Sequence, residues 1–175
     1  MINDNEIIRL QTLKEYKILD TLPEEMFDDI TSLASTICEM PISLISLIGE
    51  DRQFFKSHHG IELNETPIEL SVCKHAIESD EDMFEVINLR EDKRFKDNLL
   101  VTEDPKIVSY FGIPLKSIKG VAFGTLCVIG REKKKLNQQQ KEAIKVLSRQ
   151  VVNLLELRKS NFLLKTYQKK LELSL

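Results

Sequence analysis

The chain has 175 residues, the size of one domain with its own hydrophobic core. Its 25 basic and 28 acidic residues are interspersed and leave a formal net charge of -3, so it has no basic stripe for nucleic acid. The charged N-terminal residues do not form a signal peptide, and no apolar run has the length of a membrane span. We therefore expect a cytoplasmic domain that binds neither nucleic acid nor membrane.

The cysteines, Cys38, Cys73 and Cys127, are three in number and far apart in the sequence. An odd number with no close pair fits a reducing compartment better than a disulfide framework. The sequence has no CxxC pair, and its three histidines lack the spacing of zinc ligands. We therefore expect no metal site, and the sequence identifies no cofactor.

The N-terminal part of the chain predicts two helices. Apolar residues recur with a roughly helical period over residues 4–19, where Asn3 or Asp4 is suited to cap the first turn. Pro23 separates this helix from a second one, whose apolar residues recur at steps of three and four before the chain reaches Pro41.

The middle of the chain predicts β-structure. Residues 42–48 are a short apolar run, typical of a strand covered on both faces. Asp51-Arg52 is predicted as the turn to a partner strand over 54–57. The later segments are predicted, in order, as a loop over 58–69, a short helix over 71–79, a short strand over 84–87, an irregular segment over 90–102, and strands over 107–115 and 121–129. The predicted order is two helices, then strands with inserted loops, then a final helix. This order excludes the regular βαβ alternation of a parallel sheet and favours an α+β fold.

After Asn137, a plausible helix cap, the chain is predicted to be helical to its end, about 36 residues or about 54 Å. An amphipathic helix packed on its own sheet accounts for the part up to Leu157. Beyond it, leucines recur seven apart with polar residues between them, which favours a parallel coiled coil. We therefore expect a homodimer held by one seam, with help from the N-terminal helix. The seam comprises Leu147, Val151, Leu154, Leu157, Leu164 and Leu171.

Six short segments, in this order and spacing, resemble the GAF domain, specifically the bacterial branch found in front of histidine kinases and nucleotide cyclases. The segments are residues 51–57, 65–67, 71–77, 94–98, 110–115 and 124–129. The resemblance covers about residues 5 to 158. It implies a sensory or regulatory module without catalytic residues, working as a homodimer with an effector such as a histidine kinase or a nucleotide cyclase. The resemblance does not identify the small molecule that such a module would bind.

The resemblance also implies the architecture. We expect a PAS-like central antiparallel sheet of about six strands, with the N-terminal and C-terminal helices on one face. The loops and short helix of residues 58–102 would cover the other face and enclose a cavity. The expected divisions are an N-terminal helix over 1–20, the GAF domain over 21–158, and a C-terminal signalling helix over 159–175, where the coiled coil is expected.

The expected cavity combines aromatic walls with a few polar groups, as ligand sites usually do. The residues expected to line it are Phe55, Cys73, His75, Arg94, Tyr110 and Thr125. Gly124, beside Thr125 in a strong strand, removes bulk where another element or a ligand approaches closely.

Local bonds are the simpler explanation for the polar members of this set. On a helix, Cys73 and His75 point about 200° apart, which argues against a direct nucleophile–base pair. A buried thiol and a histidine bonded to a backbone carbonyl is the simpler interpretation. Arg94 either pairs with an anionic ligand or ties down its own loop through the backbone or Asp97.

Three other branches of the GAF family remain as alternatives. Bilin binders carry a cysteine followed at once by histidine, whereas here a lysine separates Cys73 from His75, about thirty residues before the equivalent strand. Free methionine sulfoxide reductases need two thiols within reach of each other. We expect Cys73, on a helix, and Cys127, in a central strand, not to form such a catalytic pair. Cyclic nucleotide is a third candidate, although its usual signature residues are not visible.

Overall fold

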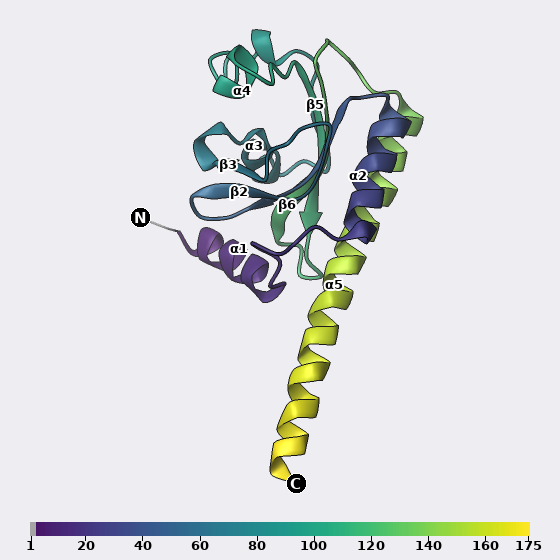
Figure 1. Ribbon diagram of the computed structural model, residues 1–175. Helices are drawn as coiled ribbons and strands as arrows, with labels where there is room; N and C mark the ends of the chain where they lie inside the picture. Colours follow the sequence, from purple (N-terminus) through teal and green to yellow (C-terminus); the bar gives the residue numbers. More distant parts are fainter. Residues whose placement is uncertain (1–2) are drawn as a thin grey trace.

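The computed structural model describes residues 3–175 and has an α+β fold built on a six-stranded antiparallel sheet (Figure 1). The strand order is β3-β2-β1-β6-β5-β4. The elements are α1 Asp4–Glu15, α2 Glu25–Cys38, β1 Ile42–Ile48, β2 Arg52–His59, β3 Glu65–Pro67, the 3-10 helix η1 Ile68–Leu70, α3 Val72–Glu78, β4 Phe84–Val86, the 3-10 helix η2 Leu89–Glu91, α4 Leu99–Thr102, β5 Ser109–Lys116, β6 Ala122–Gly130 and α5 Gln138–Ser174. The predicted fold class is confirmed.

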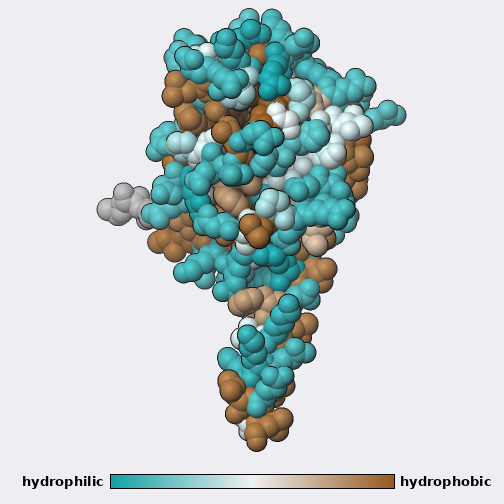
Figure 2. Space-filling view, in the orientation of Figure 1, coloured by the Kyte–Doolittle hydropathy of each residue, from teal (hydrophilic) through white to brown (hydrophobic). Residues whose placement is uncertain are grey.

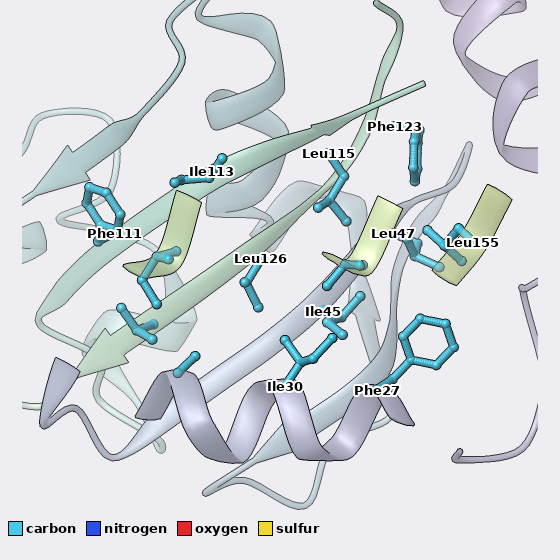
Figure 3. Packing of buried hydrophobic residues seen from close by; sticks show 14 of the residues in the cluster. Phe27, Ile30, Ile45, Leu47, Phe111, Ile113, Leu115, Phe123, Leu126 and Leu155 are labelled. Atoms are coloured by element: carbon cyan, nitrogen blue, oxygen red, sulfur yellow. The ribbon is translucent and has the colours of Figure 1, made fainter. Parts of the chain in front are cut away.

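The sheet is covered on both faces. Helices α2 and α5 lie on one face, and α3 and the short segments around it lie on the other (Figure 1). Each position of β1 is buried, because successive side chains enter opposite clusters. On the α2 and α5 side the cluster includes Phe27, Ile45, Leu126 and Leu155 (Figure 3).

Helix α1 lies at one end of the sheet, beside the β1–β2 turn, rather than flat on the α5 face (Figure 1). Arg9 donates hydrogen bonds to the carbonyls of Ile48 and Gly49 in that turn. The helix ends before residue 19, because Lys17 adopts a left-handed conformation with φ of 51°. Tyr16 then joins the core on the α5 side, where its ring packs 4.8 Å from that of Phe123.

The sequence-based boundaries need two corrections around the hairpin. Strand β2 begins at Arg52, so the turn lies one residue earlier than predicted, and it is closed by a bond from the Gly49 amide to the Arg52 carbonyl. The predicted loop over 58–69 contains the edge strand β3, which pairs antiparallel with the start of β2. Strand β3 has only three residues, too few to show the alternation of apolar and polar residues by which a strand is recognised in a sequence.

The segment over 90–102, which shows no period in the sequence, is built from two short helical turns. Asn88 and Asn98 cap them by accepting hydrogen bonds from the amides of Arg90 and Leu100. Asparagine favours such caps and turns, so local side-chain bonds replace hydrophobic periodicity here.

Helix α5 has 37 residues and starts with a capping box. Asn137 is the cap, as predicted. Its side chain accepts a hydrogen bond from the Gln140 amide at 2.9 Å, and the Gln140 side chain accepts one from the Asn137 amide at 3.0 Å. The first half of the helix packs on the sheet through residues spaced by four, three and four. These are Ile144, Ser148, Val151 and Leu155. Each of the three apolar ones contributes about 1.5–3 kcal/mol by its burial.

This packing corrects one member of the predicted dimer seam. Val151 is fully buried in the domain's own core, so it has no surface left for a second copy. The seam residues Leu147 and Leu154 are partly buried against the same core. Beyond Leu155 the helix leaves the sheet and projects from the domain (Figure 1). None of the helices over residues 3–175 combines the length and the apolar character of a membrane span.

A network of charges holds α5 where it leaves the domain. The Lys56 ammonium, on a fully buried side chain of β2, lies 2.6 Å from the Glu24 carboxylate. Arg158 of α5 lies 3.3 Å from the same carboxylate, and Tyr16 donates a hydrogen bond to Glu156, two residues earlier in α5. The segment between α1 and α2 therefore links the sheet to the exit of α5.

Candidate functional site

The loop-covered face of the sheet has Cys73 at its centre. Its sulfur lies 3.1 Å from the Tyr110 hydroxyl of β5 and 3.1 Å from the Thr125 hydroxyl of β6, both of which donate to it. The Cys127 sulfur, also in β6, is 4.0 Å away. All four residues are buried. Strand pairing explains the convergence, because β5 and β6 are neighbours and α3 packs across them.

Gly112 allows Tyr110 to reach this position. A side chain at residue 112 would place its first carbon only 2.8 Å from Cζ of the Tyr110 ring. The phenol ring therefore lies over its own strand, in space that only glycine leaves free. Gly112 pairs with Cys127 across the β5–β6 ladder, which brings the ring's hydroxyl to the two thiols.

The surroundings shift the pKa values of the two thiols in opposite directions, although the Tyr110 and Thr125 hydroxyls lower both. Burial raises the pKa of Cys73, but hydrogen bonds from Cys127, Thr125 and Tyr110 outweigh it, and the pKa falls to about 7. The pKa of Cys127 is raised well above its usual value, first by burial and then by Cys73. The pKa of Tyr110 is raised as well, again mainly by burial. Cys73 is therefore the more acidic thiol of this pair.

A buried polar cluster fixes α3, and with it Cys73, to the sheet. The Gln53 carbonyl oxygen accepts hydrogen bonds from Ser46 at 2.9 Å and from Ser71 at 2.8 Å. Its amide nitrogen donates to Thr66 at 2.7 Å. Ser71 is also the cap of α3, where it accepts from the Lys74 amide. One glutamine thus satisfies hydroxyls from three separate elements.

We expect Gln53→Leu to lower the free energy of unfolding by about 2 kcal/mol, because the buried hydroxyls lose their shared partner. Urea unfolding followed by circular dichroism measures this. The control is Gln139→Leu, the same change at an exposed position of α5, which should stay within about 0.5 kcal/mol of wild type. Equal effects of the two changes would contradict the role given to Gln53.

A cavity does lie between the sheet and residues 58–102, and its volume is about 30 Å³. Of the six expected lining residues, Phe55, Cys73 and Tyr110 line it, and Thr125 bonds Cys73 beside it. A buried water needs about 10–15 Å³, so the cavity holds about two waters. Pockets for small-molecule ligands measure about 300–1,000 Å³. The face is therefore almost closed, and a larger ligand requires α3 or the neighbouring loops to move outward.

His75 and Arg94 lie outside this inner group. The Nδ1 atom of His75 is 3.3 Å from the Ser71 carbonyl, which is the local bond that the simpler interpretation predicts. Arg94 ties down its own loop, but through Asp92 rather than Asp97, with two hydrogen bonds at 2.7 and 3.0 Å. The Arg94 guanidinium lies beside the ring of Phe95, 5.0 Å from its centre. Its charge is paired within the loop.

Aromatic rings join the inner and outer groups. The Tyr110 and Phe84 rings are 5.9 Å apart, those of Phe84 and Phe95 are 6.4 Å apart, and those of Phe95 and His75 are 4.8 Å apart. The packing is edge-to-face, the arrangement that aromatic quadrupoles favour. The six predicted residues therefore do not form one cavity wall. They form two groups, which are linked by a series of rings in edge-to-face contact.

The sequence suggested that Gly124 makes room for a ligand in the cavity, but it does not. It lies one residue before Thr125 and so faces the opposite side of β6. A side chain there would collide with the carbonyl oxygen of Ser46 in the neighbouring strand β1. Gly124 is required by strand-to-strand approach, the other of the two roles expected for it.

A larger groove lies elsewhere, between α1, α3 and the β5–β6 connection, with a volume of about 510 Å³. None of the six expected residues lines it. Its walls carry both signs of charge, from residues such as Glu6, Arg9, Lys74 and Glu78. Glu6 and Arg9 are paired with each other. Within residues 3–175, no group of three or more histidine, cysteine or acidic side chains is placed to hold a metal ion.

Comparison with known proteins gives the family. The model of the GAF domain matches residues 22–155. The chain belongs to the GAF domain family. A curated relative from Pseudomonas aeruginosa, named "Cyclic di-GMP phosphodiesterase PA2567", is 35% identical to this GAF domain over 129 residues. The match covers 74% of the present chain but only 22% of the relative, so the chain spans about a fifth of that protein.

Solved GAF domains share the fold at low sequence identity. The blue-light absorbing form of the Thermosynechococcus elongatus PixJ GAF domain matches with a TM-score of 0.64 at 11% identity, covering 97% of this chain and 96% of that one. The GAF domain of an Acinetobacter phosphoenolpyruvate-protein phosphotransferase matches with a TM-score of 0.61 at 14% identity, covering 91% and 98%. A type II free methionine-R-sulfoxide reductase from Thermoplasma acidophilum matches with a TM-score of 0.54 at 10% identity, covering 75% and 95%.

Proposed function

We propose that this GAF domain is a regulatory module that works as a homodimer and passes a signal to an effector domain through α5. The observation that carries the proposal is the uncovered apolar stripe on the projecting half of α5. Leu157, Leu164 and Leu171 are 57%, 60% and 65% exposed and recur at seven-residue intervals. Figure 2 shows apolar residues on this helix end, which no other part of the described chain covers.

A second copy of the same helix suits this stripe. A seven-residue repeat keeps one face of a supercoiled helix against its partner, and polar residues within the seam fix the register at a cost in stability. Asn161 and Gln168 occupy such intermediate positions. A coiled coil over residues 159–175 would therefore be less stable than an all-leucine one. Weak pairing of this kind gives two helix arrangements of similar free energy, which a signal can interconvert.

The relatives support a proposal for the effector. The sequence of this chain resembles GAF domains that are placed before histidine kinases and nucleotide cyclases. The curated relative is named for cyclic di-GMP hydrolysis, in a protein much longer than its matching segment. We propose an enzyme of signal transduction as the partner of this module, with the phosphodiesterase type as one candidate beside the kinase and the cyclase.

We propose that the domain itself is not an enzyme. A methionine sulfoxide reductase needs two thiols in reach of each other and room for its substrate. Cys73 lies on a helix and Cys127 in a central strand, as expected. That placement does not keep the two thiols apart, however, because their sulfurs are 4.0 Å from each other. The cavity beside them, of about 30 Å³, has no room for an amino acid.

The sheet can influence α5 through the charges at its exit. Lys56 of β2, Glu24 and Arg158 of α5 form one chain of ion pairs. A ligand or partner that moves β2 would change this chain, and it shifts the output only by the difference in its affinity for the two helix arrangements. A coupling of about 1–3 kcal/mol changes the output about 5- to 150-fold.

We expect the full chain to sediment as a dimer. Leu164→Glu, which puts a charge in the exposed seam, or a truncation after Arg158, which removes Leu164 and Leu171, should shift it toward monomer. Sedimentation velocity over a range of concentrations measures this. Phe162→Glu is the matched control, since Phe162 is a half-exposed apolar residue off the heptad positions. A full chain that sediments as a monomer at every concentration would refute the proposal, and so would a dimer that both changes leave intact.

A further inference from the structure

We propose that Cys73 and Cys127 are an oxidant-sensitive thiol pair, which hydrogen peroxide converts into an intramolecular disulfide. The site is a modification site distinct from the dimer seam of α5. It rests on the geometry of the loop-covered face and does not depend on the proposed relay function.

The geometry brings the sulfurs to within a small movement of each other. Their separation is 4.0 Å, and a disulfide bond measures about 2.05 Å, so they must approach by about 2 Å. Cys127 lies in the central strand β6, which is paired on both sides. Cys73 lies on α3, a helix of seven residues that packs over the sheet. The approach therefore falls on the Cys73 side chain and on α3, and the bond from Ser71 to Gln53 must adjust with any shift of this helix.

The two hydroxyls aimed at Cys73 make it the attacking sulfur. Tyr110 and Thr125 both donate to it, and each of these bonds strengthens when the sulfur carries a negative charge. The pKa of Cys73, lowered to about 7, agrees with that arrangement, whereas Cys127 keeps its proton. A thiolate beside a protonated thiol is the arrangement in which one sulfur reacts with oxidant and the other resolves the product.

The cavity supplies access and selects the oxidant by size. Cys73 and Tyr110 line the space of about 30 Å³, with Leu63 and Leu100 also in its wall. That volume holds about two waters, and hydrogen peroxide contains two oxygen atoms. Larger disulfides such as glutathione do not fit, so we expect a small peroxide and not a thiol–disulfide exchange partner to reach the sulfur.

The reaction balances without any further reactant. The Cys73 thiolate attacks one oxygen of hydrogen peroxide, an S–O bond forms, the O–O bond breaks, and the hydroxide released takes up a proton and leaves as water. Cys73, oxidised by two electrons, is then a sulfenic acid. The Cys127 sulfur attacks the Cys73 sulfur, the S–S bond forms, the S–O bond breaks, and the hydroxyl leaves as water with the proton of Cys127. In sum, two thiols and one peroxide give one disulfide and two waters.

Cys38 is an internal control. It is as deeply buried as the pair but belongs to the cluster on the opposite face of the sheet. Burial raises its pKa to about 11, against a smaller opposing effect of Lys134. We therefore expect Cys38 to stay reduced under conditions that oxidise the pair.

The test treats the full chain with a small excess of hydrogen peroxide at pH 7, then unfolds it, alkylates the remaining thiols and measures the mass. We expect a loss of 2 Da, one alkylation at Cys38, and a Cys73–Cys127 cross-link in a non-reduced digest. Cys127→Ser should stop at a sulfenic acid that dimedone traps on Cys73. Tyr110→Phe should slow the oxidation about threefold, because it removes one donor from the thiolate.

Three alkylated thiols after peroxide would overturn the proposal. Oxidation of Cys38 as fast as that of Cys73, or a disulfide between two copies of the chain, would do the same. Cys38→Ser, which leaves the pair untouched, must cross-link like wild type. Because the decisive comparison is made between the cysteines of the wild-type chain, the test does not depend on any variant folding.

Discussion

Replacing Glu24 by alanine is expected to lower the free energy of unfolding by about 3 kcal/mol, a large effect for a surface loop residue. The cause lies in its partner. The Lys56 side chain is fully buried, and Glu24, 2.6 Å from its ammonium group, is its counter-charge. The remaining acceptors are the Thr21 hydroxyl at 2.8 Å and the Leu22 carbonyl at 2.5 Å, both uncharged. Without Glu24 a full positive charge stays buried, and the folded state bears that cost.

A double-mutant cycle separates this effect from the loss of Glu24 itself. Lys56→Met removes the buried charge while it keeps the length of the side chain, and Glu24 then still pairs with Arg158. We expect this variant, and the double variant with Glu24→Ala, to lie closer to wild type than Glu24→Ala alone. Urea unfolding at one fixed protein concentration measures all four, because the proposed dimer would make stability concentration-dependent. A Glu24→Ala protein as stable as wild type would show that Lys56 does not need a counter-charge.

Much of the fold follows from apolar periodicity. The buried run over 42–48, the strong strands near 107–115 and 121–129, and the cap at Asn137 all correspond to observed elements, within two residues at the boundaries. Elements without a period were missed. Strand β3 has three residues, and η2 and α4 depend on asparagine side chains rather than on an apolar stripe.

The site was harder to predict because its residues meet through topology. Cys73 and Cys127 are 54 residues apart, and only the β1–β6–β5 pairing under α3 brings their sulfurs together. Gln53 gave no signal in the sequence, since a lone glutamine in a strand usually faces solvent. His75 and Arg94 were chosen for their chemistry, but local partners account for the bonds of both.

Gly124→Ala is expected to lower the free energy of unfolding by about 3 kcal/mol. A methyl group at this position would collide with the Ser46 carbonyl oxygen of β1, a backbone atom that no side-chain rotation can move. The β1–β6 ladder must therefore open locally, and overpacking of this kind costs about 1–3 kcal/mol or more. The same ladder pairs Thr125 with Ser46 and so positions the Thr125 hydroxyl to donate its hydrogen bond to Cys73. We therefore expect the pKa of Cys73 to rise in the same variant, as measured by the pH dependence of its alkylation rate.

Gly120→Ala separates collision from backbone conformation. Gly120 has a φ of 83°, which alanine adopts at a cost of about 1–2 kcal/mol, but no atom lies within 4 Å of the added carbon. It lies in the β5–β6 connection, away from the ladder with β1. We expect Gly120→Ala to be the milder change and to leave the pKa of Cys73 unaltered. If Gly124→Ala were no worse than Gly120→Ala, close approach of the β1 and β6 backbones would not be the reason for a glycine at residue 124.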